Sequence, residues 1–174
     1  MSNNGRVQDL VAIVTGAGSG IGQASAIRLA EEGATVICAD INGESVNATV
    51  KQIFDAGFKA EGRSIDIADS QACTDLVDST ATKFGSVDIL VNNAGVNLPG
   101  VFHEVTNETI DRTLNVNVKG AMFLTRAALP HMLKKQRGSI VNMSSVNGLV
   151  SEPYLSVYSA SKGAIVMFTR GIAL

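Results

Sequence analysis

Short apolar runs in this chain alternate with longer stretches in which apolar residues recur every three or four positions. The runs predict strands at residues 10–15, 35–40, 59–66, 87–92 and 138–144. The stretches between them predict helices at residues 20–33, 44–57, 69–85 and 107–135, since their apolar positions fall on one helical face. A last helical pattern begins at about Ser156 and continues to Leu174.

Strands that alternate with helices predict a parallel sheet covered on both faces, and continuous apolar runs indicate buried strands. Gly33, Gly57 and Gly85 each follow a helical pattern, where a left-handed residue commonly ends a helix. We therefore expect one α/β domain over residues 1–174, a doubly wound Rossmann-type fold with three α/β/α layers. The final helical pattern has no cap signal, so we expect a fold truncated after its fifth strand, with the C-terminal part missing.

Composition narrows the classes of function. Hydrophobic residues make up 45% of the 174 and charged residues 17%, with a formal net charge of -2, which argues against nucleic-acid and anionic-membrane partners. The start of the chain is polar and no run of ~20 apolar residues follows, so we expect a cytoplasmic protein. Cys38 and Cys73 are isolated and predict buried free thiols. His103 and His131 lack ligand spacing, so no metal site is predicted.

The first predicted strand leads into "TGAGSGIG", residues 15–22. Glycines in a turn between a strand and a helix let a pyrophosphate approach the backbone, beside the unpaired N–H groups that begin the helix. Asp40 ends the second predicted strand, where a carboxylate binds ribose hydroxyls and repels a 2′-phosphate. Neither Ser19 nor Ile41 offers a cation for such a phosphate. The pattern therefore predicts NAD as cofactor, with NADP less favoured.

Tyr158 and Lys162 are four residues apart in the last helical pattern, so their side chains share one face of the helix. Moving a hydride from an alcohol also requires moving the hydroxyl proton, and a free phenol ionises only near pH ~10, so a tyrosine base needs a cation close by. Tyr154 is eight positions before Lys162 and follows Pro153. It is the weaker candidate, either a wall of the substrate pocket or a packing aromatic.

Five motifs together resemble the short-chain dehydrogenase/reductase family. They are "TGAGSGIG" (15–22), "NNAG" (92–95), "VNVKG" (116–120), "SSVNG" (144–148) and "YSASK" (158–162). The resemblance implies a single-domain NAD(P)-dependent oxidoreductase that acts on alcohols and carbonyls. It also implies a cofactor site built from Gly16, Ser19, Gly20, Ile21, Gly22, Asp40, Asp66, Ile67, Asn93, Ala94, Gly95, Tyr158 and Lys162.

The same resemblance implies the catalytic set Asn117, Ser145, Tyr158 and Lys162. Ser145 would donate a hydrogen bond to the substrate oxygen, which leaves Ser144 with a structural role. Asn117 would kink its helix and hold a water that connects Lys162 to solvent. A satisfied buried amide is the alternative for Asn117, and Asn115 is expected to face elsewhere. Asn92 and Thr15 are expected to brace two strand ends.

The sequence thus predicts an oxidoreductase that transfers a hydride between NAD and a secondary alcohol or ketone, with Tyr158 as general acid and base. The alternative is an NAD-binding or partner-dependent module without turnover, because of the expected truncation. The partner is expected to be a small alcohol or carbonyl compound, which could be a polyol, a 3-oxoacyl group, a steroid or a simple alcohol. The resemblance implies a homodimer or homotetramer for the full-length protein.

Overall fold

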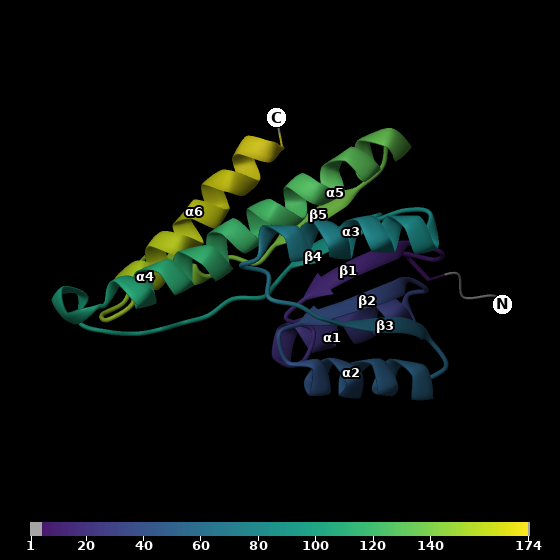
Figure 1. Cartoon of the computed structure of the whole chain (residues 1–174), viewed down its shortest axis with the longest axis horizontal. Coiled ribbons are helices and arrows are strands. Elements are labelled where there is room, and N and C mark those ends of the chain that lie inside the picture. Colours follow the sequence, from purple (N-terminus) through teal and green to yellow (C-terminus); the bar gives the residue numbers. More distant parts are fainter. Residues whose placement is uncertain (1–4, 174) are drawn as a thin grey trace.

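A computed structural model describes residues 5–173 of the chain (Figure 1). The strands are β1 (Val11–Thr15), β2 (Thr35–Asp40), β3 (Lys59–Ser64), β4 (Ile89–Asn92) and β5 (Ser139–Asn142). The α-helices are α1 (Gly20–Glu31), α2 (Gly43–Asp55), α3 (Ser70–Phe84), α4 (Asn107–Leu114), α5 (Ala121–Lys135) and α6 (Ser156–Ile172). All neighbouring strands are parallel, in the order β3-β2-β1-β4-β5. This confirms the predicted Rossmann-type fold.

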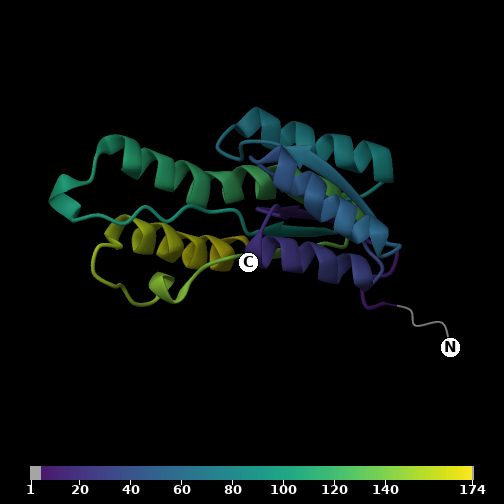
Figure 2. The ribbon, with the colours of Figure 1, turned by 90° about the horizontal axis from the view of Figure 1, so that it is seen from below.

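Two hydrophobic clusters hold the layers together, one on each face of the sheet. Val14 of β1 and Val46 of α2 belong to the first cluster, which joins α1 and α2 to the sheet. Ile13 of β1 and Leu124 of α5 belong to the second, which joins α3 and α5 to the opposite face. Because successive strand residues point to opposite faces, the neighbours Ile13 and Val14 anchor two different layers. Helix α6 lies beside α4 (Figures 1 and 2).

The strands at the two edges of the sheet are less buried than the central ones. The residues of β1 and β4 are all buried, and β2 is buried in its middle. In β3 no residue is fully buried, and in β5 Val141 is 48% exposed. A strand at the edge of a sheet has a neighbour on one side only, so its outer flank lacks the packing that central strands have.

The helix ends agree closely with the sequence. Gly33, Gly57 and Gly85 have positive φ angles of 96°, 85° and 80°, as expected for residues that end helices. Helix α6 begins at Ser156, the residue at which the pattern was predicted to start. The helix predicted over 107–135 is interrupted, because residues Asn115–Gly120 form a π-helical segment between α4 and α5. Such segments often occur at functional sites.

Asp88 joins the N-terminal ends of three strands, on the side of the sheet away from the glycine turn. Its side chain is 1% exposed and accepts hydrogen bonds from the Val11 backbone N–H (2.9 Å), the Ser86 hydroxyl (2.8 Å) and the Arg137 guanidinium (2.7 Å). Burial opposes ionisation, yet these hydrogen bonds hold the pKa of the Asp88 carboxyl below its ordinary value. Asp88 therefore stabilises the fold most when it is ionised.

We predict that Asp88→Ala lowers the free energy of unfolding by about 3 kcal/mol at neutral pH, because it leaves buried donors without an acceptor. A carboxyl whose pKa is depressed in the folded state stabilises above its unfolded pKa of ~3.9 and loses that contribution as the pH falls further. The difference between parent and variant should therefore narrow below about pH 4. Urea unfolding followed by circular dichroism measures it. The control Asp55→Ala removes an exposed partner of Lys51, and an equal effect there would refute the prediction.

No helix in the described part of the chain has the length and the apolar character that a membrane span requires.

Candidate active site

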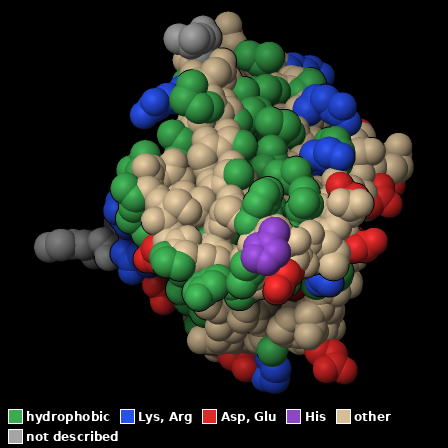
Figure 3. Space-filling view, turned by 90° about the vertical axis from the view of Figure 1, so that its left-hand side faces the viewer, with side chains coloured by type: hydrophobic (Ala, Val, Ile, Leu, Met, Phe, Trp, Pro, Cys, Tyr) green, Lys and Arg blue, Asp and Glu red, His purple; other side chains and the backbone are tan. Residues whose placement is uncertain are grey.

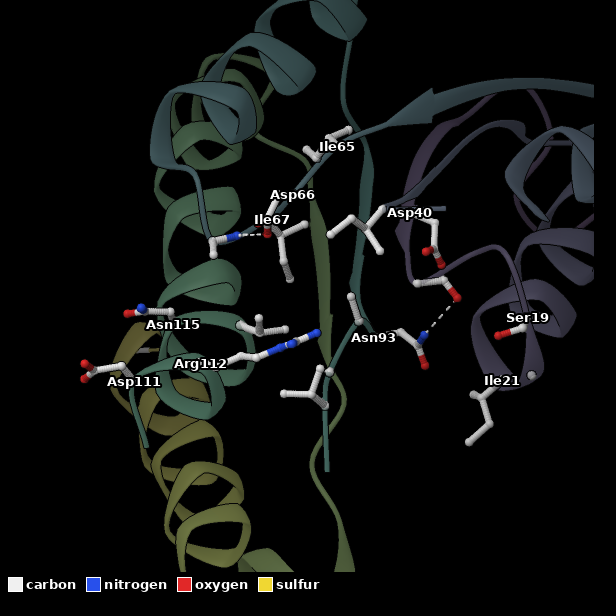
Figure 4. A pocket seen from close by; sticks show the side chains of 18 of the residues that line it. Ser19, Ile21, Asp40, Ile65, Asp66, Ile67, Asn93, Asp111, Arg112 and Asn115 are labelled. Atoms are coloured by element: carbon white, nitrogen blue, oxygen red, sulfur yellow. Dashed lines mark hydrogen bonds between the residues drawn. The ribbon is translucent and has the colours of Figure 1, made fainter. Parts of the chain in front are cut away.

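A cavity of about 960 Å³ opens at the carboxyl ends of the strands (Figure 4). It lies where β1 separates β2 from β4, at the point where the chain order of the sheet reverses, and ligands of doubly wound sheets bind at such points. Ten of the predicted cofactor residues line it: Gly16, Ser19, Gly20, Ile21, Asp40, Asp66, Ile67, Asn93, Ala94 and Gly95. These ten residues are therefore together in space, whereas the other three predicted cofactor residues, Gly22, Tyr158 and Lys162, do not line the cavity.

The glycine turn leaves no room for side chains at two of its positions. A Cβ at Gly22 would lie 2.1 Å from the carbonyl oxygen of Gly16, and one at Gly16 would lie 2.7 Å from Nδ2 of Asn93. Gly22 is buried and is not among the residues that line the cavity, so its role is close packing of the turn. Gly20 has a φ of 56° and an open space in front of it, which lets a ligand approach the backbone where α1 begins.

Asp40 is held in a fixed orientation at the end of β2. Its Oδ2 accepts a hydrogen bond from the Gly18 backbone N–H (3.1 Å), and its Oδ1 accepts one from the Asn42 backbone N–H (3.1 Å). A Cβ at Gly18 would lie 3.1 Å from Oδ2 of Asp40. The glycine turn and the acidic residue thus form one unit, with the carboxylate on the wall of the cavity (Figure 4).

Thr15 and Asn92 brace the ends of β1 and β4, as predicted. The Thr15 hydroxyl donates to the Val91 carbonyl (3.3 Å) and accepts from the backbone N–H groups of Asn93 and Ala94, both at 3.1 Å. The Asn92 amide donates to Asn142 (2.8 Å), which connects β4 to β5. These contacts orient the segment after β4, so that Asn93 reaches back to the glycine turn (Figure 4).

Sequence reasoning missed the wall of the cavity that α4 and the π-helical segment supply. Glu108, Asp111, Arg112, Asn115 and Val116 all line it. Asn115 faces elsewhere than Asn117, as expected, and the direction in which it points is this wall of the cavity. Figure 4 shows the Arg112 side chain extending into the cavity. The wall could not be predicted from sequence motifs, because it depends on how closely α4 approaches the strand ends.

Tyr158 and Lys162 lie one turn apart on α6, as predicted. Nζ of Lys162 is 5.7 Å from the centroid of the Tyr158 ring and donates a hydrogen bond to the Met143 carbonyl (2.8 Å). Lys162 is 4% exposed, and burial lowers the pKa of its ammonium group. No carboxylate within residues 5–173 forms an ion pair with Lys162. Its charge is therefore available to the phenol and to a ligand.

Lys162 lies behind one of the residues that line the cavity. A Cβ at Gly95, one of the lining residues, would be 3.5 Å from Nζ of Lys162 and 3.1 Å from Oδ1 of Asn117. Gly95, which has no side chain, is thus the residue that lies between the cavity and Lys162. None of Asn117, Ser145, Tyr158 and Lys162 is among the cavity-lining residues, and Asn117 and Lys162 lie directly behind this glycine.

Asn117 is buried in the π-helical segment, with both of its amide atoms satisfied. Its Oδ1 accepts from the Val96 backbone N–H (2.7 Å), and its Nδ2 donates to the Val96 carbonyl (2.9 Å) and to the Ser161 hydroxyl (3.0 Å). Ser161 in turn donates to the Tyr158 carbonyl (2.6 Å). The predicted helix irregularity and the satisfied amide are both present. Asn117 connects the loop after β4 to the helix that carries Tyr158.

The two adjacent serines after β5 have different hydrogen-bond partners. The Ser144 hydroxyl donates to the Lys162 carbonyl (2.9 Å), a contact that joins β5 to α6. The Ser145 hydroxyl contacts Asn147 instead, with 3.3 Å to Oδ1 and 3.2 Å to the backbone nitrogen. Ser144 is therefore structural, whereas Ser145 is held by a short turn.

Exposed apolar side chains lie on the segment after β4 and on the segment between β5 and α6. Two loops supply them, and the backbone N–H of Gly100 donates to the Tyr154 carbonyl (2.9 Å), which ties these loops together. The exposed side chains are Val101, Phe102, Val146, Leu149, Val150 and Tyr154. Figure 3 shows apolar side chains gathered on this end of the molecule. Tyr154 is 65% exposed and precedes α6, so it is not a packing aromatic of the core.

The fold and the site define a nucleotide-binding α/β protein with a tyrosine–lysine pair beside the nucleotide cavity. The family model described as "short chain dehydrogenase" matches residues 10–174. The chain therefore belongs to the short-chain dehydrogenase family.

Individual proteins of this family resemble the chain along nearly its whole length. Cyclopentanol dehydrogenase of Comamonas testosteroni is 39% identical over 98% of the chain and 68% of its own length. A crystal structure of NAD+-bound xylitol dehydrogenase has a TM-score of 0.93 and 34% identity, covering 97% of this chain and 65% of that one. A metagenomic short-chain oxidoreductase in complex with NADP has the same TM-score and identity, covering 96% and 76%. The chain spans about two thirds of the length of the first two.

Proposed function

We propose that the protein is an NAD-dependent oxidoreductase that interconverts a secondary alcohol and its ketone. The observation that carries this proposal is the buried Lys162, which has no acidic partner among the described residues and lies beside Tyr158 and behind Gly95 of the cavity lining. A buried cation without a counter-ion is costly unless a ligand or a reacting group uses it. Family membership supports the same chemistry.

The residues present fit a dinucleotide. Gly20 offers an open stretch of backbone at the start of α1, and Gly16 and Gly22 allow the turn around Gly20 to pack closely. Ser19 and Ile21 flank the same turn on the cavity wall, and Asp40 would accept hydrogen bonds from the adenosine ribose. Asp66 and Ile67 would hold the adenine, and Asn93, Ala94 and Gly95 would lie alongside the cofactor. When bound, the nicotinamide of NAD would supply the hydride acceptor of the reaction.

The charges on the cavity favour NAD over NADP. Four lining side chains are carboxylates, those of Asp40, Asp66, Glu108 and Asp111, and the single cationic one is Arg112. A 2′-phosphate adds charge of up to about -2 near neutral pH, since its second pKa is ~6. Asp40 is the residue nearest the expected position of that phosphate and would repel it, whereas Arg112 extends from the opposite, α4 wall (Figure 4).

In the proposed reaction, Tyr158 takes the hydroxyl proton of the alcohol, and returns it in the reverse direction. Lys162 stabilises the negative charge that the phenol oxygen carries before it takes the proton, and that it carries again after it returns a proton in the reverse direction. Ser145 donates a hydrogen bond to the substrate oxygen and stabilises charge as it develops there. Asn117 holds the loop and helix that position these groups, and the Lys162 ammonium can pass the proton onward to solvent.

We propose that the substrate is an apolar secondary alcohol and not a polyol. The side chains at the mouth of the site, Phe102, Leu149, Val150 and Tyr154 among them, are apolar and exposed. They would bury against a ring or an alkyl chain at about 25 cal/mol per Å², but would pair poorly with several hydroxyl groups.

A substrate panel tests the proposed function. The native gene product would be mixed with NAD or NADP and with cyclopentanol, xylitol, a steroid alcohol or a 3-hydroxyacyl thioester. We expect absorbance of the reduced nicotinamide with NAD and an apolar alcohol. Binding of NADH without turnover on any alcohol would favour the module without catalysis, and the absence of both would refute the proposal. The assembly proposed from the family, a dimer or tetramer, is measured by sedimentation of the same sample.

A further inference from the structure

Within residues 5–173, Asn147 is the only residue that forms a hydrogen bond with the Ser145 hydroxyl. The Asn147 backbone N–H donates to Ser145 Oγ at 3.2 Å, and the Asn147 Oδ1 lies 3.3 Å from the same oxygen. Asn147 is 7% exposed, although it lies in a short turn. The burial of a polar side chain whose hydrogen bonds all go to one hydroxyl group calls for a structural or functional explanation.

The other end of this amide has no partner. Nδ2 of Asn147 is one of two buried side-chain polar atoms in the described residues that make no hydrogen bond. A buried amide donor without an acceptor costs about 1–3 kcal/mol. The two ends of an amide have nearly the same shape, so a half-turn about its terminal bond exchanges Oδ1 and Nδ2 without displacing any neighbour.

We propose that Asn147 is a positioning residue for Ser145, with its Nδ2 turned to donate to Ser145 Oγ when substrate is bound. Ser145 Oγ then accepts two hydrogen bonds, from the backbone N–H and from Nδ2 of Asn147, which occupy both of its lone pairs. The hydroxyl proton of Ser145 is then free to be donated to the substrate oxygen in a hydrogen bond. This inference rests on the proposed function, in which Ser145 donates that bond.

In the orientation that the structure shows, the amide competes with the substrate, because the Ser145 hydroxyl donates to Oδ1 of Asn147 (3.3 Å). The substrate oxygen would have to displace this contact. With the amide reversed, no acceptor of Asn147 faces the hydroxyl. The atom left without a partner is then a carbonyl oxygen, and an unpaired buried carbonyl is tolerated better than an unpaired N–H.

The turn that carries Asn147 is locked against the catalytic helix. A Cβ at Gly148 would lie 2.6 Å from the Ser144 hydroxyl and 2.8 Å from the Lys162 carbonyl. The turn therefore has a fixed position relative to α6, where Tyr158 and Lys162 reside. Asn147 acts from this fixed position, so it sets the direction of the Ser145 hydroxyl relative to the phenol.

The variant Asn147→Asp tests the proposal in the direction of ketone reduction. Its carboxylate cannot donate, so near neutral pH we expect kcat to fall by about tenfold to a hundredfold, less than the loss of an oxyanion donor itself. As the pH falls, the introduced carboxyl becomes protonated and can donate to Ser145 Oγ, and burial raises its pKa. The ratio of variant to parent kcat should therefore recover in acid. The control Asn47→Asp places the same change on the exposed side of α2 and should show no such recovery.

Asn147→Leu has a similar volume and no polar atom, so it should fold and lose kcat without recovery in acid. In a Ser145→Ala background, Asn147→Asp should cause no further loss, because its effect acts through the serine. Three outcomes would overturn the inference and leave the proposed function intact. They are a kcat loss from Asn147→Asp that is as large in the Ser145→Ala background as in the parent, a kcat loss that does not depend on pH, and an unchanged kcat. A parent protein without turnover would overturn both.

Discussion

Tyr158→Phe should lower kcat by about a thousandfold or more, within the range expected for the loss of a general acid and base. The substitution removes one oxygen and keeps the ring, so the packing of α6 and the contact of Lys162 with the ring face are retained. NADH binding should change by less than about twofold, because the cavity is lined by residues other than Tyr158. Steady-state kinetics and a calorimetric titration of NADH measure the two quantities separately.

Tyr154→Phe is the matched control, since it removes the same group from the only other tyrosine of the chain. Tyr154 is exposed and lies before α6, with no lysine one turn away. We expect its kcat to remain within a few fold of the parent. If Tyr154→Phe were the inactive variant and Tyr158→Phe were active, the assignment of the base would be reversed.

Asp40→Ala should lower the preference for NAD over NADP by a factor similar to the loss of kcat expected for Tyr158→Phe. The carboxylate would accept hydrogen bonds from the ribose, each worth about 1.5–3 kcal/mol when one partner is charged, so kcat/KM with NAD should fall by about a hundredfold. Removing the charge also relieves the repulsion of a 2′-phosphate, which is about 4 kcal/mol for unit charges ~4 Å apart at an effective dielectric of ~20. The preference for NAD over NADP should therefore fall by about a thousandfold or more.

Asp75→Ala, on the exposed side of α3, serves as the control for removing a carboxylate far from the cavity. The ratio of kcat/KM for NAD and NADP should be unchanged in that variant. An Asp40→Ala enzyme that kept the parental ratio would show that Asp40 does not select the cofactor. The selection would then have to come from another part of the cavity, for which the α4 wall with Arg112 is the first candidate.

The parts of the site that the sequence predicted are those with local signals. Gly16, Gly20 and Gly22 mark a turn that only glycine can form, and Asp40 is placed by the end of β2, whose apolar pattern is unambiguous. The spacing of Tyr158 and Lys162 is converted directly into one helical turn. In each case the structural consequence depends on a few neighbouring residues.

The parts that the sequence did not predict depend on contacts between distant segments. Arg112 and Asn115 line the cavity because α4 approaches the strand ends, and nothing in their own surroundings in the sequence indicates it. Asn147 lies inside a recognisable motif, yet its contact with Ser145 depends on the fold of a single turn. The exposure of β3 follows from its place at the edge of the sheet, which periodicity does not supply.

Transfer of deuterium is the measurement that tests the central claim most directly. The native gene product would be incubated with NAD and with a secondary alcohol that carries deuterium on its carbinol carbon, and the product cofactor examined by NMR. We predict deuterium on the nicotinamide ring of the reduced cofactor, and none when the alcohol is unlabelled and the solvent is D₂O. Deuterium that came from the solvent, or a reduced cofactor without label from the alcohol, would contradict hydride transfer at this site.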